Sequence, residues 1–221
     1  MKSSILVFML SAVITLNGCS QNNSQKRATA EASDKKTGGS CEGCKIIYES
    51  PVPFEKLNSV DTLPDFNEGG PKMMISGIIY KADGKTPVKD VVLYIYHTDQ
   101  TGHYVNKNNE SGWAGRQGYI KGWLKTNEKG EYKFYTLKPG VYPERNVPAH
   151  IHPVIKEPGI EDYYIDEFLF DDDPLLTNAE RKKQENRGGS GIIKLQQKDG
   201  MLIGERNIIL GLNIPGYPIN R

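Results

Sequence analysis

The stretch EYKFYTLKPGVY, residues 131–142, alternates apolar and polar side chains and then reaches a Pro-Gly pair. A period of two places alternate side chains on opposite faces of a β-strand, and Pro139 with Gly140 marks a turn. Similar short runs recur from about residue 70 to the C-terminus, separated by further Asp-Gly and Lys-Gly turn signals. Strands at this spacing predict an all-β fold, built as an antiparallel sandwich or barrel.

Two further patterns refine this prediction near the C-terminus. Residues 194–210, KLQQKDGMLIGERNIIL, read as two strands joined at an Asp-Gly turn, and we expect a hairpin there. Residues 175–187 are the one helical pattern, with Thr177 or Asn178 as N-cap and Gly188 as the stop. We expect this helix to be a short excursion on the surface of the sandwich.

The N-terminus has the pattern of an export signal. Lys2 precedes an apolar run over residues 5–16, which is shorter than the roughly 20 residues that span a bilayer. The run ends at Leu-Asn-Gly-Cys, which resembles the lipobox of bacterial lipoproteins. We therefore expect residues 1–18 to be a lipoprotein signal peptide and Cys19 to carry the lipid, with an ordinary secretory signal as the alternative. A lipid anchor would place the protein in the bacterial cell envelope, at the outer membrane or the periplasmic face.

The segment behind Cys19 is polar and has no apolar periodicity. We interpret residues 19–45 as a disordered tether and residues 46–221 as one folded domain. Cys41 and Cys44 lie at the end of this tether, and in an exported protein they are expected to form a disulfide. A redox motif or a metal site is a weaker interpretation, because the flanking strand and helix and the further ligands are missing. The formal net charge of +1 argues against nucleic acid as a partner.

The chemistry of the chain is concentrated in YPERNVPAHIH, residues 142–152. His150 and His152 are two positions apart, so in a strand they share one face and can take two positions around one metal ion. Tyr142 lies on the same rigid stretch, and Tyr104 follows an earlier strand. A phenolate needs a strong Lewis acid to form near neutral pH, and trivalent iron is one. The alternative is a pair of solvated strand histidines.

Together, VVLYIYHTDQTGHY, residues 91–104, and the Tyr-Pro and His-x-His pattern of residues 142–152 resemble the intradiol ring-cleavage dioxygenases. The resemblance is to the catechol and protocatechuate dioxygenase family, and to its extracellular or lipoprotein branch. It implies a prealbumin-like β-sandwich that holds one Fe(III) per chain. The ligands that it implies are Tyr104, Tyr142, His150 and His152.

The resemblance also implies a reaction and its reactants. A small aromatic diol and O2 would be the substrates, and the ring would open between its two hydroxyl-bearing carbons to give a muconate-type diacid. Tyr142 would be displaced by the catechol, and Arg145 would stabilise developing negative charge, unless it is only a solvated loop arginine. Glu167 is expected to contact the substrate, where better-known members often have glutamine. The resemblance allows a homodimer, and it leaves His97 off the metal; a backbone carbonyl is expected to satisfy that ring.

Two other functions fit parts of this pattern. Small prealbumin-like domains of surface lipoproteins share the strand and turn patterns and act as catalytically inactive binding modules. Such a domain has no need of His-x-His after the tyrosine, so we place the enzyme first. A copper oxidase built on the same four ligands is the third interpretation.

Overall fold

The computed structural model describes residues 36–107 and 109–218. The predicted signal peptide, Cys19 and the tether up to residue 35 lie outside the described residues. Within the described ranges, no helix combines the length and the apolar character that crossing a membrane requires.

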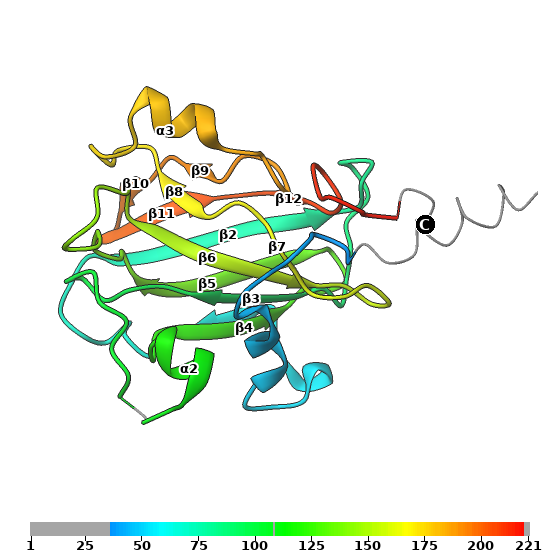
Figure 1. The fold of residues 1–221 in the computed structure, drawn as a ribbon, viewed down its shortest axis with the longest axis horizontal. Helices are drawn as coiled ribbons and strands as arrows, with labels where there is room; N and C mark the ends of the chain where they lie inside the picture. Colours follow the sequence, from blue (N-terminus) through cyan, green and yellow to red (C-terminus); the bar gives the residue numbers. More distant parts are fainter. Residues whose placement is uncertain (1–35, 108, 219–221) are drawn as a thin grey trace, which may run out of the picture. The chain divides into compact units, whose positions relative to one another are not determined.

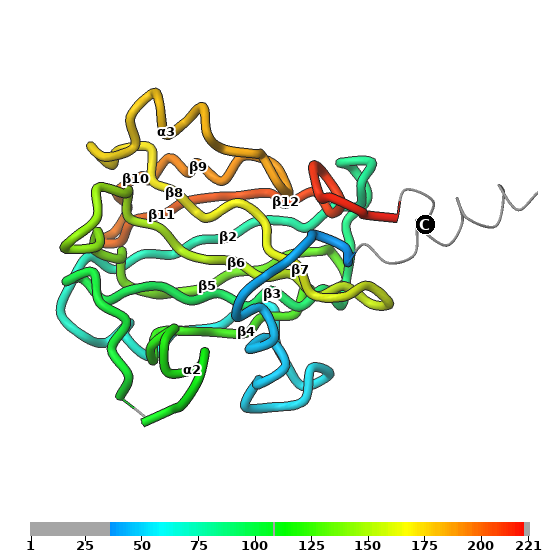
Figure 2. The backbone as a smooth tube through the Cα atoms, in the orientation of Figure 1, coloured from blue at the N-terminus to red at the C-terminus, as the bar shows by residue number. Residues whose placement is uncertain are grey.

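The folded unit contains two six-stranded β-sheets (Figures 1 and 2). The first sheet runs, in spatial order, β1 (Val60–Thr62), β5 (Glu131–Leu137), β2 (Lys72–Tyr80), β11 (Met201–Glu205) and β10 (Gln196–Lys198), with β12 (Ile208–Ile209) also paired to β2. The second sheet runs β4 (Lys121–Lys125), β3 (Val92–Tyr96), β6 (His150–Lys156), β8 (Phe168–Phe170) and β9 (Ile192–Ile193), with β7 (Tyr163–Tyr164) paired to β6. The predicted all-β sandwich is confirmed.

Each sheet combines antiparallel and parallel pairs of strands. Strand β2 pairs antiparallel with β5, and β3 pairs antiparallel with β4 and β6. The pairs β1–β5, β2–β11, β2–β12 and β8–β9 are parallel. The expectation of a wholly antiparallel sandwich is therefore too simple, because strands distant in sequence complete the sheets without a hairpin.

The two sheets pack through one apolar core. Along β2, every second side chain is buried, which is the alternation that the sequence predicts. Phe134 from β5 meets Phe168 from β8 edge to face, with ring centroids 5.8 Å apart. Burying such apolar surface stabilises the sandwich by roughly 25 cal/mol per Å².

Strand β3 is buried on both faces, and an N-terminal segment explains why. The outer face of the second sheet is the face turned away from the sandwich core. A second apolar cluster covers it, in which Ile47 of the 3-10 helix η1 (Cys44–Glu49) packs with Tyr94 of β3. The short helix η2 (Phe54–Lys56) follows η1, and α2 (Gly112–Arg116) contributes Ala114 to the same cluster.

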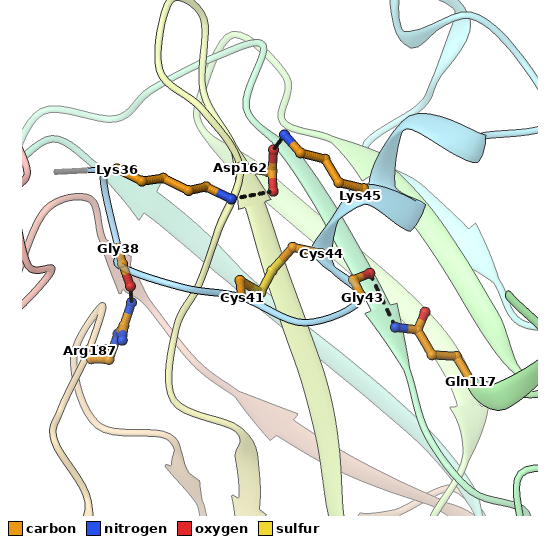
Figure 3. Close-up of a disulfide and its surroundings, with 9 residues drawn as sticks. All are labelled: Lys36, Gly38, Cys41, Gly43, Cys44, Lys45, Gln117, Asp162 and Arg187. Carbon is orange, nitrogen blue, oxygen red and sulfur yellow. Dashed lines mark hydrogen bonds and ion pairs between the residues drawn. A yellow bond between two sulfur atoms is a disulfide. The ribbon is translucent and has the colours of Figure 1, made fainter. Parts of the chain in front are cut away.

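The N-terminal segment is fastened to the domain at several points (Figure 3). Gly38 donates its N–H to the carbonyl of Pro215 at 2.7 Å and accepts from Arg187 Nη2 at 2.9 Å. Lys45 Nζ lies 2.6 Å from a carboxylate oxygen of the buried Asp162. The predicted boundary at residue 45 is therefore wrong: the folded unit begins at Lys36. Residues 36–45 are held by backbone hydrogen bonds and ion pairs. Contacts of this kind do not require a periodic pattern of apolar residues, so the sequence gives no sign of them.

The predicted helix and hairpin are both present. Helix α3 (Asn178–Lys183) begins at the cap Thr177, whose side chain accepts from the N–H of Glu180 at 3.3 Å. The helix ends before the predicted stop at Gly188, because the backbone is already extended at Gln184. Strands β10 and β11 form the antiparallel hairpin.

Candidate metal centre

Strand β6 presents both histidines on the outer face of the second sheet. His150 and His152 open this strand, with the buried Ile151 between them pointing into the core. Tyr96, at the end of β3, is the partner of His152 in the strand register, and its ring stacks on the imidazole with centroids 4.6 Å apart. The alternation of the strand therefore fixes both imidazoles on one side, as predicted.

Two loops bring the tyrosines to these histidines. The loop after β3 carries Tyr104, and the loop after β5 carries Tyr142. Gly102 has φ +81°, and a Cβ there would lie 1.8 Å from the carbonyl oxygen of Val141. The N–H of Gly140 donates to the carbonyl of Asp99 at 2.9 Å and ties the same loops together. Only glycine at position 102 permits this close approach.

Four polar side-chain atoms converge where these elements meet. The hydroxyls of Tyr104 and Tyr142 are 2.7 Å apart. Tyr142 Oη lies 3.1 Å from His150 Nε2 and 3.4 Å from His152 Nε2. The two Nε2 atoms are 3.1 Å apart, and His152 Nε2 is 3.0 Å from Tyr104 Oη. We call these four side chains the donor cluster.

The cluster has the dimensions of a metal shell. Two donors bound at about 2.0–2.1 Å to one ion lie roughly 2.8–3.4 Å apart at angles of 90–109°. The distances above cover that range. The chemistry is unusual, however: no group of three or more His, Cys, Asp or Glu side chains suited to a metal occurs among the described residues. A metal held here would depend on two phenolic oxygens in addition to two imidazoles.

The protonation of the histidines suits a metal ligand. His150 Nδ1 lies 2.7 Å from the carbonyl of Pro148, so Nδ1–H donates there and Nε2 faces the cluster. Burial, with smaller contributions from His150 and His97, holds the pKa of His152 well below its ordinary value. The imidazole of His152 is therefore neutral near pH 7.

The phenols need a cation to ionise. Burial raises the pKa of Tyr104 above the usual phenol value, and the neighbouring Tyr142 raises it further. Burial also raises the pKa of Tyr142, although the Tyr104 hydrogen bond and then the charge of Arg145 oppose that rise. A strong Lewis acid would offset this cost. The donor set therefore fits a hard, highly charged ion.

The remaining predicted residues surround the cluster at different distances. The guanidinium of Arg145 is exposed and lies 5.8 Å from the centre of the Tyr142 ring. Glu167 Oε1 lies 3.6 Å from Nδ1 of His152, on the opposite edge of that ring from Nε2. Cys41 and Cys44 are joined in a disulfide, with Cα atoms 5.6 Å apart.

His97 was expected to bond to a backbone carbonyl and not to a metal. Its Nδ1 lies 2.7 Å from the Thr98 carbonyl, which confirms the expected hydrogen bond.

Two cavities border the donor cluster. The first, of about 190 Å³, lies beside His152 and Glu167 and is lined on one part of its wall by residues 40–44, which we call the disulfide loop. The second, of about 410 Å³, is lined by His103, Tyr104, Tyr142, Pro143, Glu144 and Arg145. The sequence did not single out Tyr96 or Gln117, which line the first cavity. The Tyr-Ile-Tyr alternation of β3 was a signal for Tyr96, but only the register with β6 places it on His152.

Part of this chain is similar to proteins of a known family. The sequence profile of a family described as "Dioxygenase" matches residues 49–187. This chain belongs to the intradiol ring-cleavage dioxygenase family. Within it, the protocatechuate 3,4-dioxygenase beta chain of Burkholderia cepacia is 27% identical over 113 residues, which are 48% of each chain. The chain thus spans about half the length of this curated relative.

Solved structures of the family share the fold. The dioxygenase domain of a carbohydrate-binding fusion from Streptomyces sp. SirexAA-E aligns with a TM-score of 0.53 at 19% identity, over 73% of this chain and 94% of that one. The catechol 1,2-dioxygenase of Acinetobacter sp. ADP1 aligns with a TM-score of 0.51 at 16% identity, over 74% of this chain and 61% of that one. At these identities the likeness concerns the fold alone.

Proposed function

We propose that this protein is a non-haem Fe(III) dioxygenase that opens a catechol-type ring between its two hydroxyl-bearing carbons. The observation that carries the proposal is the donor cluster, in which two phenols and two imidazoles converge with neighbouring donor atoms 2.7–3.4 Å apart. Tyr104, Tyr142, His150 and His152 would hold one iron per chain. Membership of the family supports the same chemistry.

The iron would act as a Lewis acid that binds the two hydroxyl oxygens and prepares the ring for attack by O2. The protein residues would orient the ligand side chains, accept a proton from the substrate and stabilise negative charge. The carbonyl of Pro148 fixes the ring of His150 through Nδ1–H. Tyr142 Oη, whose pKa is raised by burial, would take a proton from an incoming catechol hydroxyl. Arg145 is the nearby cation that would favour negative charge on this edge of the site.

The proposed reaction balances without an external reductant. The bond between the two hydroxyl-bearing carbons breaks, and each carbon receives one atom of O2 and becomes a carboxyl carbon. The catechol supplies all the electrons, so O2 is reduced as the ring is oxidised. The product is a muconate-type diacid, and no nicotinamide or flavin takes part.

The alternative of a catalytically inactive binding module is less well supported. Such a module would gain nothing from burying two phenols and two imidazoles with their polar atoms directed at one another. A copper site on the same residues is disfavoured by the two phenolic oxygens, which are hard ligands suited to Fe(III). We further propose that lipidated Cys19 anchors the enzyme to the cell envelope.

Metal analysis of the purified chain lacking residues 1–18 tests the proposal. We expect about one iron per chain and a red-brown colour without substrate, because charge transfer from tyrosinate to Fe(III) absorbs visible light. A colourless protein that binds zinc, or that takes up no metal when supplied with iron, would favour the binding module instead.

A further inference from the structure

The first cavity lies against the donor cluster and has a fixed wall. His152 and the stacked Tyr96 form one side, and the disulfide loop forms the other. Gln117 donates its Nε2–H to the carbonyl of Gly43 at 3.3 Å and holds the loop in place (Figure 3). A Cβ on Gly43, where φ is +77°, would lie 2.7 Å from that same nitrogen. The loop therefore packs too closely to be a loose cover.

The size of this cavity suits a small group. Its volume of about 190 Å³ is below the roughly 300–1,000 Å³ of sites that hold drug-sized ligands. A substituent of a single aromatic ring fits such a space. The cavity is therefore suited to part of the catechol that the proposed function requires.

The charged groups that line the cavity are all acidic. Glu42 and Glu167 contribute carboxylates, and no lysine or arginine of the described ranges lines it. Two lysines flank the disulfide loop in sequence, Lys36 and Lys45, and both are paired with Asp162, at 3.5 and 2.6 Å (Figure 3).

Two arginines lie close to the cavity, but behind its wall. Arg206 donates its Nη1–H to the carbonyl of Asp166 at 2.7 Å, next to Glu167, and does not line the cavity. The guanidinium of Arg187 packs on the ring of Tyr164 at 3.5 Å from the centroid and donates to Gly38. Arg187 is almost wholly buried and does not line the cavity. A substituent inside the cavity would therefore meet carboxylates first.

The position of Glu167 relates this charge to the substrate. Its carboxylate lies 3.6 Å from His152 Nδ1, across the imidazole ring from the Nε2 that faces the donor cluster. If the two hydroxyls of a catechol lie at the donor cluster, a substituent on the far side of the ring lies about one ring width from the cluster. A substituent that extends past the imidazole ring of His152 would therefore lie beside the carboxylate of Glu167.

We propose that the first cavity receives the ring substituent of the substrate, and that Glu42 and Glu167 select catechols carrying an ammonium group over those carrying a carboxylate. This inference rests on the proposed function, because it takes the diol to be held at the donor cluster. An ammonium group would pair with a partly exposed carboxylate, whereas a carboxylate would be repelled.

Three matched catechols test the selection. Their dissociation constants are measured without O2, by calorimetry on the iron-loaded protein, for 4-(aminomethyl)catechol, 4-methylcatechol and 3,4-dihydroxybenzoate. We expect the ammonium compound to bind about fivefold more tightly than the methyl compound, the upper range for a partly exposed ion pair. The carboxylate compound should bind most weakly.

Two variants locate the effect. Glu167→Gln should move the ratio of the ammonium and methyl dissociation constants toward one, with Glu42 accounting for what is left. Comparing ratios cancels any effect of the substitution at the metal that is the same for both compounds. Glu144→Gln, which removes a carboxylate from the second cavity, should leave the ratio at its wild-type value. The inference is overturned if the wild-type ratio is one, or if Glu144→Gln abolishes it and Glu167→Gln does not. A protein that holds no iron and binds none of the three catechols would overturn the proposed function itself.

Discussion

The close approach at Gly102 gives the sharpest structural prediction, because it brings Tyr104 beside Tyr142. In Gly102→Ala, the new Cβ would lie 1.8 Å from the Val141 carbonyl oxygen. Ordinary contacts between carbon and oxygen are roughly 3.3 Å or longer, so the two loops must separate by about 1.5 Å. Metal–ligand distances tolerate only about 0.2 Å. We therefore expect Gly102→Ala to bind iron at least about tenfold more weakly while the sandwich stays folded.

A second glycine provides the matched control. Gly84 also has a positive φ, of +66°, but a Cβ there would meet nothing closer than the Ile209 side chain at 3.5 Å. Both alanine variants carry a similar backbone strain of about 1–2 kcal/mol, which lowers the melting temperature by roughly 2–8 °C. Thermal unfolding reports the backbone strain that both variants share. Iron content and visible absorption report the displacement of the two tyrosine loops that is expected only in Gly102→Ala. Equal iron binding by Gly102→Ala and Gly84→Ala would refute the reasoning.

Two further predictions concern individual side chains. His152→Ala should lose nearly all iron, whereas Tyr142→Phe should keep much of it, with a weaker and shifted colour, and fail to turn over catechol; wild-type turnover in Tyr142→Phe would contradict this division of roles. Burial lowers the pKa of His97 to about 4 in the folded chain, against 6.5 when the chain is unfolded. Between these two pH values the unfolded chain binds one more proton than the folded chain, so acid favours unfolding. Stability should fall by up to about 3 kcal/mol as the pH drops from 6.5 to 4, and urea unfolding of His97→Gln should lack this component.

Much of the fold was predictable from side-chain alternation. Residues 131–137 alternate because β5 buries one face only, and the same period places His150 and His152 together. The helix after Thr177 was predictable from its cap. These features depend on near neighbours in sequence, which a single chain displays directly.

Features that depend on distant pairs were not predictable. Lys45 and Asp162 are 117 positions apart, so nothing near residue 45 shows that the segment docks. Tyr96 joins the site only through its register with His152. The charge of Glu167 was visible, but the side of the imidazole on which it lies required the structure.

The most direct test of the central claim is the stoichiometry and product of the reaction with catechol. The iron-loaded protein is mixed with catechol and O2, without any reductant, and both reactants and the product are quantified. We predict that catechol and O2 disappear in equal amounts and that the product is the ring-opened diacid. A ring-opened aldehyde acid would place the cleavage outside the diol, and iron-loaded protein that consumes no O2 with any of the catechols named above would contradict the account altogether.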